Sequence, residues 1–458
     1  MDFEAKIRED RESLICDIKK MVSINSVEAE PEEGMPFGKG PAEALKCFLA
    51  IAEEMGFQTE NFDNYAGHAD YGEGEEMVGI LGHVDVVPCG DGWVCDPFSP
   101  EIIDGKLYGR GVLDNKGPMM VCLHALKILK EMGLPLTKKV RLIVGANEET
   151  DWKCMDYYFN KKKITPPQIS FTPDAEFPLK HGEKGVFQYE LVTDLSEEIV
   201  IAGGNAFNSV PEYAYVMLPQ EMKERIEEKR NFWEKETGCS YEVKQEDEKL
   251  KLEVFSVAAH AANPERGINA VTGLMRALWE LHPAGELGEI AQFYMEKIGS
   301  DLQGRKLGVD LEDEVSGKLS FNVGKVEVAD QKLIFSVDNR VPVSYPCKEA
   351  QERVEKGIAG TRFRFEHPDI TESIYTPKDS FLVETLMDVY KDVTGDTDAE
   401  PQVDGACSYA RALDNCVAFG AILPGQPDLM HQRNEYLELD QLEMWMKIYL
   451  EAIYRLAK

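Results

Sequence analysis

A histidine and an aspartate lie two positions apart directly behind an apolar segment, in Gly82-His83-Val84-Asp85. The apolar residues 77–81 are typical of a buried strand, so we expect His83 at the carboxyl end of that strand. Open α/β sheets bind their ligands at that edge. A metal-binding histidine also needs an acid beside it that fixes its tautomer, and Asp85 has the right spacing for that role. A satisfied polar pair beneath a loop would have the same sequence, so this pattern leaves both interpretations open.

Four other segments place carboxylates or an imidazole at the expected ends of strands or at the start of a helix. Each is ambiguous alone, because a lone aspartate before a helix is usually an N-cap and paired glutamates usually lie on a solvated face. Their common placement in one layer of the fold favours a shared site over chance. The residues are Asp114 before an expected helix, Glu148 and Glu149 after a strand over 140–146, Asp174 after a strand over 169–172, and His431 after a strand over 417–423 and a loop.

Two imidazoles and three carboxylates form a ligand set that zinc, manganese or cobalt accepts. Five ligands exceed what one tetrahedral ion needs when water must bind as well, and with one bridging carboxylate they suit two ions about 3.5 Å apart. Glu148 is then left over as the general base that acts on a metal-bound water. The predicted cofactor is a pair of divalent ions, zinc first and manganese or cobalt as alternatives, and the predicted ligands are His83, Asp114, Glu149, Asp174 and His431.

The pattern of apolar segments indicates an α/β fold, with a layered catalytic domain around a central, mostly parallel sheet and an inserted α+β domain. We expect the catalytic domain over residues 1–185 and 379–458, and the insertion over 186–378. Helices are expected over 3–22, 41–55, 116–132, 211–229, 267–281, 382–393 and 439–456, and strands over 77–81, 140–146, 169–172, 187–192, 250–257 and 417–423.

The composition excludes several classes of protein. The chain has 458 residues and a formal net charge of −33, which opposes binding to nucleic acid or to an anionic membrane. No apolar run approaches the roughly 18 residues that span a bilayer, and the N-terminus lacks the pattern of a secretory leader. The ten cysteines contain no Cys-x-x-Cys pair, so we expect reduced thiols, of which Cys89 and Cys95 are either inert or oxidant-sensitive. We therefore expect a cytoplasmic protein without a nucleic-acid or membrane partner.

Together, these motifs resemble the di-zinc aminoacylase, carboxypeptidase and dipeptidase family of metallopeptidases. The resemblance begins with the segments 82–85, 111–118 and 147–149. It narrows to the bacterial PepV-type dipeptidase branch and covers most of the chain, from near Gly82 to the C-terminus. The segments that narrow it are Gly92-Trp93, Asp174-Ala175-Glu176-Phe177-Pro178, Glu183-Lys184-Gly185, Asn208-Ser209-Val210-Pro211 and Met430-His431-Gln432-Arg433-Asn434-Glu435.

The resemblance implies a role for each matching residue. It implies an inserted domain that acts as a lid and contributes groups to the substrate site. Among these groups, the resemblance implies a histidine that donates to the oxyanion and an arginine that binds the substrate carboxylate. Both suit the chemistry, because acyl transfer needs a donor aimed at developing charge and arginine binds a carboxylate with two hydrogen bonds. In the implied scheme His83 and Asp174 hold one ion, Glu149 and His431 hold the other, and Asp114 bridges them. Asp85 orients His83, and Glu148 is the acid and base. His260 reaches the oxyanion, and Asn208 and Arg340 bind the substrate carbonyl and carboxylate.

The segment expected to line the substrate carboxylate, which includes Gly405 and Ser408, departs from the pattern of the branch. Ser408 replaces a threonine hydroxyl, and Cys407 adds bulk and a thiol where access to the backbone is expected. The lid segment after His260 has two alanines where Gly-Ser or Ala-Ser is common. None of these positions is a predicted metal ligand, so the departures bear on substrate preference.

We interpret the chain as a metal-dependent exopeptidase that hydrolyses dipeptides with free amino and carboxyl ends through a metal-activated water. Its partner would be a small peptide substrate, and the resemblance implies a monomer. One alternative is a deacylase of N-acyl amino acids on the same two ions. Another is a non-catalytic peptide- or metal-binding protein, which Glu148 and His260 disfavour because a binder needs neither a base nor an oxyanion donor.

Overall fold

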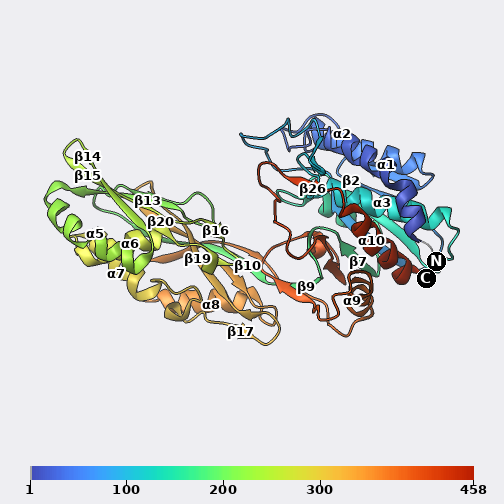
Figure 1. Ribbon diagram of the computed structural model, residues 1–458. Helices are drawn as coiled ribbons and strands as arrows, with labels where there is room; N and C mark the ends of the chain where they lie inside the picture. Colours follow the sequence, from blue (N-terminus) through green and yellow to red (C-terminus); the bar gives the residue numbers. More distant parts are fainter. Residues whose placement is uncertain (1–2) are drawn as a thin grey trace. The chain divides into compact units, whose positions relative to one another are not determined.

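The protein, seen here in a computed structural model that describes residues 3–458, divides into two units. Unit 1 consists of residues 1–181, 376–402 and 407–458, and unit 2 consists of residues 182–375 and 403–406. Unit 1 is therefore assembled from both ends of the chain, and its blue N-terminal helices and red C-terminal helix appear together in Figure 1.

The sheet of unit 1 has a parallel centre and antiparallel margins. Its order is β1-β2-β6-β3-β7-β24, with β9 beyond β24. The strands β6, β3, β7 and β24 run parallel, whereas β1, β2 and β9 pair antiparallel. The predicted α/β class is confirmed, and the sheet is mixed. The strands are β1 (Gln58–Phe62), β2 (Ala66–Tyr71), β3 (Met77–His83), β6 (Lys139–Gly145), β7 (Ile169–Thr172), β9 (Lys180–Glu183) and β24 (Cys416–Ala418).

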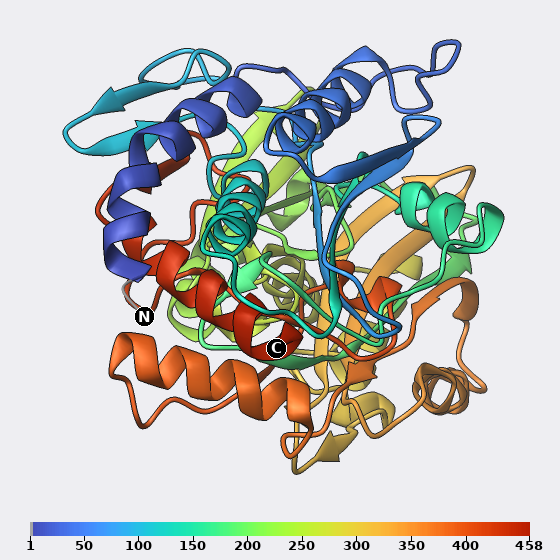
Figure 2. The ribbon, with the colours of Figure 1, turned by 90° about the vertical axis from the view of Figure 1, so that its right-hand side faces the viewer.

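Helices cover the sheet of unit 1, and its central strands are buried at almost every position. Such strands read as continuous apolar runs, because a parallel sheet is covered on both faces. Helices α3 and α10 pack against β3 and against each other, and α2 packs against β1 and β2 (Figure 2). The helices are α1 (Phe3–Val22), α2 (Lys39–Glu54), α3 (Lys116–Glu131), α4 (Lys153–Met155), α9 (Phe381–Thr394) and α10 (Leu442–Ala457), and the short strands are β4 (Glu101–Ile103), β5 (Lys106–Tyr108), β8 (Ala175–Glu176), β25 (Ala421–Ile422) and β26 (Tyr436–Glu438).

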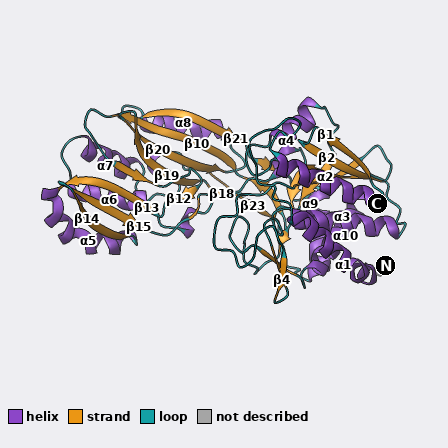
Figure 3. Ribbon diagram, turned by 90° about the horizontal axis from the view of Figure 1, so that it is seen from above, coloured by secondary structure: helices purple, strands orange, loops and turns teal. Residues whose placement is uncertain are grey.

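Unit 2 contains an eight-stranded antiparallel sheet of order β14-β15-β13-β11-β19-β20-β10-β21. Helices α6 and α8 pack against it over a core of its own (Figure 3). The strands of the sheet are β10 (Gly185–Asp194), β11 (Ile201–Gly203), β13 (Tyr213–Pro219), β14 (Ser240–Glu246), β15 (Lys249–Phe255), β19 (Ser320–Ala329), β20 (Lys332–Val341) and β21 (Arg364–Thr371). The other elements are α5 (Lys223–Thr237), α6 (Ala270–Leu281), α7 (Glu286–Lys297), α8 (Cys347–Ile358), β12 (Ser209–Val210), β16 (Ala259–His260), β17 (Glu312–Asp313), β18 (Gly317–Lys318), β22 (Ile374–Tyr375) and β23 (Gln402–Asp404).

One expected element of unit 2 is wrong. A helix is predicted from the sequence over 211–229, but residues 213–219 form β13 and α5 begins only at Lys223. Buried and half-buried positions alternate along Tyr213–Leu218, which is the period of a strand. The charged helix that follows obscured this short alternation in the sequence.

Two expectations about composition can be compared with the structure. All ten cysteines, which lie within residues 3–458, are free thiols. Across the same described residues, no helix combines the length and the apolar character that crossing a bilayer requires.

Candidate metal centre

Three neighbouring parallel strands end beside one another and deliver polar side chains to one edge of the sheet. His83 is the last residue of β3 and lies opposite Gly145, the last residue of β6. Glu148 and Glu149 follow β6, and Asp174 follows β7 on the other side of β3. The carboxyl ends of parallel strands share an edge, so these side chains converge.

Five side chains at this edge form two groups that share one carboxylate. In the first group, His83 Nε2 lies 3.0 Å from Asp114 Oδ1 and 3.5 Å from Asp174 Oδ2. In the second, His431 Nε2 lies 3.0 Å from Asp114 Oδ2 and 3.1 Å from Glu149 Oε2. Each oxygen of Asp114 therefore faces a different histidine. The structure brings together all five predicted ligands in unit 1.

The donor atoms fit divalent ions. Two ligand atoms at about 2.0–2.1 Å from a tetrahedral zinc ion lie about 3.3 Å apart, close to the observed 3.0–3.5 Å separations. Ligand atoms of His83, Asp114 and Glu149 lie within 4.8 Å of one another, as do those of His83, Glu148 and Asp174. Among the described residues, Glu149 Oε1 is buried without a hydrogen-bond partner, which is costly unless a cation is nearby.

The backbone selects the tautomer of His83. Its Nδ1 donates to the carbonyl oxygen of Asp85 at 3.0 Å, so Nε2 of the neutral ring is the unprotonated nitrogen that faces the carboxylates. The Asp85 carboxylate contributes less directly, because its Oδ1 lies 3.5 Å from His83 Nδ1. Its Oδ2 instead accepts the backbone N–H groups of Glu148 and Glu149 at 2.9 and 3.0 Å. Asp85 thus contacts both segments of the site.

Glu148 has the electrostatic environment of a proton carrier. Burial raises the pKa of its carboxyl well above the ordinary value, and the charge of Asp174 adds to this rise against the opposing influence of His83. A carboxyl that holds a proton near neutral pH can both accept and donate one. Of the two adjacent glutamates, Glu149 faces His431 in the second group, so Glu148 is the one left for this role.

The bridging carboxylate of Asp114 is ionised in spite of its burial. Burial opposes ionisation, but hydrogen bonds from His431 and His83 hold the pKa of Asp114 far below its ordinary value. The same contacts, to Asp114 and then to Glu149, raise the pKa of His431 to about 11. Burial raises the pKa of Glu149 to about 7. Protons and a divalent cation therefore compete for the same atoms.

Two buried residues without a predicted role, Asn115 and Glu435, hold this edge together. The Asn115 side-chain amide donates to the Pro173 carbonyl at 2.7 Å and to Asp174 Oδ1 at 3.2 Å. Glu435, which is fully buried, accepts the backbone N–H groups of Gly111, Leu113 and Asp114. Glu435 lies in the motif that also contains His431, and that proximity in sequence was the one signal available.

In unit 2, the predicted residues Asn208 and His260 lie on paired segments. Strand β12 pairs with β16, with Ser209 opposite His260, and the Ala261 N–H donates to the Asn208 carbonyl at 2.9 Å. His260 Nδ1 accepts the N–H of Ala262 at 3.2 Å. The proton of the neutral imidazole is therefore on Nε2, which makes that nitrogen a donor.

Arg340 is held in the same part of unit 2. Its Nε and one terminal nitrogen donate to the two carboxylate oxygens of Asp338 at 2.8 and 2.9 Å, and the other terminal nitrogen donates to the Gly405 carbonyl at 2.8 Å. A Cβ added to Gly405 would meet the Ala262 Cβ at 2.8 Å, so this close approach requires glycine. Ala262 directly follows the His260 segment, so the contact joins the Arg340 and His260 regions.

The departures in the sequence have local structural consequences. Ser408, in unit 1, accepts the Ala410 N–H at 3.2 Å and caps a short 3₁₀ helix. Cys407 is exposed.

Burial raises the pKa of both Cys89 and Cys95, which disfavours the reactive thiolate form. Of the two interpretations of Cys89 and Cys95, inert thiols are the one that these pKa shifts favour.

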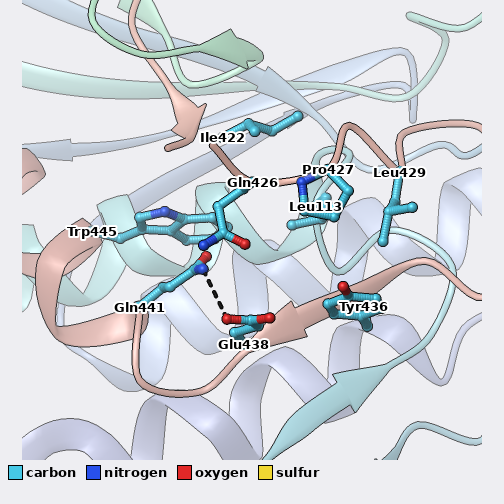
Figure 4. A pocket seen from close by; sticks show the side chains of 9 residues that line it. All are labelled: Leu113, Ile422, Gln426, Pro427, Leu429, Tyr436, Glu438, Gln441 and Trp445. Atoms are coloured by element: carbon cyan, nitrogen blue, oxygen red, sulfur yellow. Dashed lines mark hydrogen bonds between the residues drawn. The ribbon is translucent and has the colours of Figure 1, made fainter. Parts of the chain in front are cut away.

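A separate pocket lies in unit 1 (Figure 4). Leu113 and Leu429, near Asp114 and His431 in sequence, line it together with Trp445. Gln441 donates to Glu438 across its floor at 3.3 Å. None of the five predicted ligands is among the nine lining residues, so the pocket is distinct from the candidate centre.

Comparison with known proteins places this geometry in context. The model of peptidase family M20/M25/M40 matches residues 79–455. The "Putative dipeptidase YtjP" of Bacillus subtilis is 37% identical over 100% of both chains, and a "Putative dipeptidase" of Staphylococcus epidermidis is 34% identical over 99% of both. Among solved structures, human carnosine dipeptidase 1 has a TM-score of 0.57 at 15% identity and covers 98% of this chain and 97% of its own. At that identity the structural likeness shows the fold alone.

Proposed function

The chain belongs to peptidase family M20/M25/M40, as its motifs led us to expect, and from that premise we propose that it is a metal-dependent dipeptidase. Membership of a peptidase family makes it a peptide-bond hydrolase. The finer proposal is an exopeptidase that acts on dipeptides with free amino and carboxyl ends. The observation that carries this proposal is the position of Asp114. Its Oδ1 faces His83 in the first group, and its Oδ2 faces His431 in the second.

We propose that His83, Asp174 and Asp114 hold one divalent ion and that His431, Glu149 and Asp114 hold a second. When bound, the ions would polarise the scissile carbonyl and make a water molecule more acidic. The separations of 3.0–3.5 Å between donor atoms support this assignment, as does the buried, unpartnered Glu149 Oε1. Zinc is the proposed ion, and manganese or cobalt would fit the same donors.

Glu148 is the proposed general base and acid. Its raised pKa suits a group that takes a proton from the attacking water and then passes it to the leaving nitrogen of the substrate. The backbone of Glu148 is held by Asp85 Oδ2, so its carboxyl is presented by a fixed turn. A fixed proton carrier loses less motion when the reaction begins.

Unit 2 is the proposed source of substrate recognition. His260 Nε2–H would donate to the oxyanion, and Asn208 would contact the substrate carbonyl. Arg340 would bind the free carboxylate, and Gly405 and Ser408 are the other residues proposed to bind substrate. The hydrogen bonds of Arg340 to Asp338 and Gly405 support this role, because they fix the plane of the guanidinium before substrate arrives.

We further propose that the enzyme is cytoplasmic and monomeric, that its substrate is a small peptide, and that it has no nucleic-acid or membrane partner. The experiment that tests it measures amino acids released from a dipeptide panel by chelator-stripped protein, with and without added Zn²⁺, Mn²⁺ or Co²⁺. We expect metal-restored cleavage of free dipeptides and no cleavage of N-acetyl amino acids. Cleavage of N-acetyl amino acids alone would make the protein a deacylase. Tight metal binding without turnover of either class would contradict the enzymatic proposal.

A further inference from the structure

Glu435 has a buried carboxylate that contacts the proposed ligand Asp114 through the backbone N–H of that residue. Its Oε1 accepts the N–H groups of Leu113, Gly111 and Asp114 at 2.7, 3.1 and 3.3 Å. Its Oε2 accepts from the Arg110 guanidinium at 2.7 Å. Both side chains are buried, with Glu435 fully inaccessible and Arg110 1% exposed.

These contacts join two segments that are far apart in the sequence. One is the turn 110–114, which ends in the bridging ligand Asp114. The other is the segment 431–435, which begins with the ligand His431 and ends with Glu435. The Gly109 N–H also donates to the Glu435 carbonyl at 3.1 Å, so the backbone of Glu435 binds the residue just before the turn that its side chain binds.

A carboxylate is well suited to this position. Three backbone N–H groups converge on it, and acceptor oxygens that carry charge bind such donors more strongly than a neutral acceptor does. A glutamine could present only one oxygen, and its amide N–H₂ would face either a backbone donor or the guanidinium of Arg110. The turn would then lose the arrangement that directs the Asp114 carboxylate.

The two proposed metal positions depend on this arrangement to different degrees. His83 ends β3 and donates to the Asp85 carbonyl, and Asp174 follows β7 after one residue, so strands outside the turn 110–114 position both of them. Asp114 belongs to both groups, but in the second group His431 also lies in a segment that Glu435 joins, so two of its three ligands depend on Glu435, against one of three in the first group. Only Glu149 of that group is held from elsewhere, by the Asp85 contact to its backbone.

We propose that Glu435 is the positioning residue that couples the bridging ligand Asp114 to His431, and that it is required for binding of the second ion in particular. The inference rests on the two-ion site of the proposed function. It predicts an unequal effect, in which loss of the Glu435 carboxylate removes the ion of the His431 group and spares that of the His83 group.

The test uses Glu435→Gln in the full chain, with Zn²⁺ as the probe. Calorimetric titration of chelator-stripped protein measures both affinities, and elemental analysis of the dialysed protein measures stoichiometry. We expect two ions per chain in the wild type and one in the variant. The Zn²⁺ affinity of the His431 group should fall about 10- to 100-fold. Glu438→Gln is the matched control, because Glu438 lies three residues further on and pairs with Lys106 at 3.7 Å.

Glu435→Gln leaves the buried Arg110 guanidinium without its counter-charge, which could itself prevent folding. The double variant Arg110→Met/Glu435→Gln removes both charges, and circular dichroism shows whether it folds. A folded variant that binds two ions with the affinity of the wild type would overturn the inference, as would equal weakening of both sites. These readouts need no substrate, so they are independent of whether the wild type cleaves dipeptides.

Discussion

Asp85 Oδ2 accepts the backbone N–H of Glu148 at 2.9 Å, and through this contact the residue beside the first ligand holds the proposed base. Asp85 was expected to act on His83 through its carboxylate. In the structure its carbonyl oxygen binds His83 Nδ1, while its carboxylate holds the turn of Glu148 and Glu149. One residue thereby sets the relative placement of a ligand from β3 and a base from the end of β6.

Asp85→Ala should weaken metal binding and slow turnover, because it frees the backbone of the Glu148–Glu149 turn. We expect a loss of about 10- to 100-fold in Zn²⁺ affinity, measured by calorimetric titration. Asp85→Asn keeps one acceptor oxygen for the two N–H groups and should lose less. An alanine variant with unchanged affinity and turnover would show that the turn holds its shape without Asp85.

Glu148→Gln should abolish proton transfer while the metal ligands stay in place. We expect turnover of a dipeptide to fall by about 10²- to 10⁴-fold, with the metal content measured by elemental analysis unchanged. Asp151→Asn is the matched control, because Asp151 lies close by in the sequence and forms an exposed ion pair with Lys153. Equal turnover in Glu148→Gln and the wild type would exclude Glu148 as the base.

Arg340→Lys should weaken binding of the substrate carboxylate, because lysine keeps the charge but loses the planar fork. A charge-assisted hydrogen bond contributes about 1.5–3 kcal/mol, so KM for a free dipeptide should rise about 10- to 100-fold. The corresponding dipeptide amide should show no such difference between variant and wild type. Arg364→Lys provides the control, because Arg364 forms a similar two-bond pair with Asp194 on an exposed part of unit 2. If KM for both substrates rises equally, Arg340 does not recognise the carboxylate.

The buried imidazole of His124 should make stability depend on pH. It contacts Asp10 at 2.5 Å and Asp17 at 3.1 Å, between α3 and α1. Burial opposes its protonation, but these hydrogen bonds raise the pKa of His124 above its ordinary value. A raised folded-state pKa means that the contribution is complete below about pH 6.5 and is lost as the pH rises through the pKa of the folded protein.

The measurement for His124 is urea unfolding between pH 5 and 9. Among residues 3–458, His124→Leu leaves the buried Asp10 with Lys127 as its charged partner, so we expect a loss of about 3–5 kcal/mol in the free energy of unfolding at pH 6. The loss should shrink as the pH rises. His367→Gln, at an exposed histidine that pairs with Glu190, should leave the pH profile unchanged. A His124→Leu loss that is the same at every pH would contradict the assignment of a charged imidazole.

The sequence by itself determined the elements that local pattern specifies. The expected helix over 3–22 and the strand over 169–172 coincide with α1 and β7, because their apolar periodicity, or their continuous apolar character, is a property of neighbouring residues. The same reasoning placed His83, Glu149 and Asp174 directly at or after strand ends. It failed over 211–229, where a short alternation runs directly into a charged helix.

Only the tertiary structure decided which atoms of the site meet. That one Asp114 oxygen faces His431, and that Glu435 binds the turn before Asp114, depends on segments separated by more than half of the chain. Such pairings come from how the strands are ordered and how the loops pack at their ends. A local sequence pattern contains no information on that order, because the free energy that selects it comes from contacts between distant segments. The kinds of ligand could therefore be predicted from the sequence, whereas their partners required the fold.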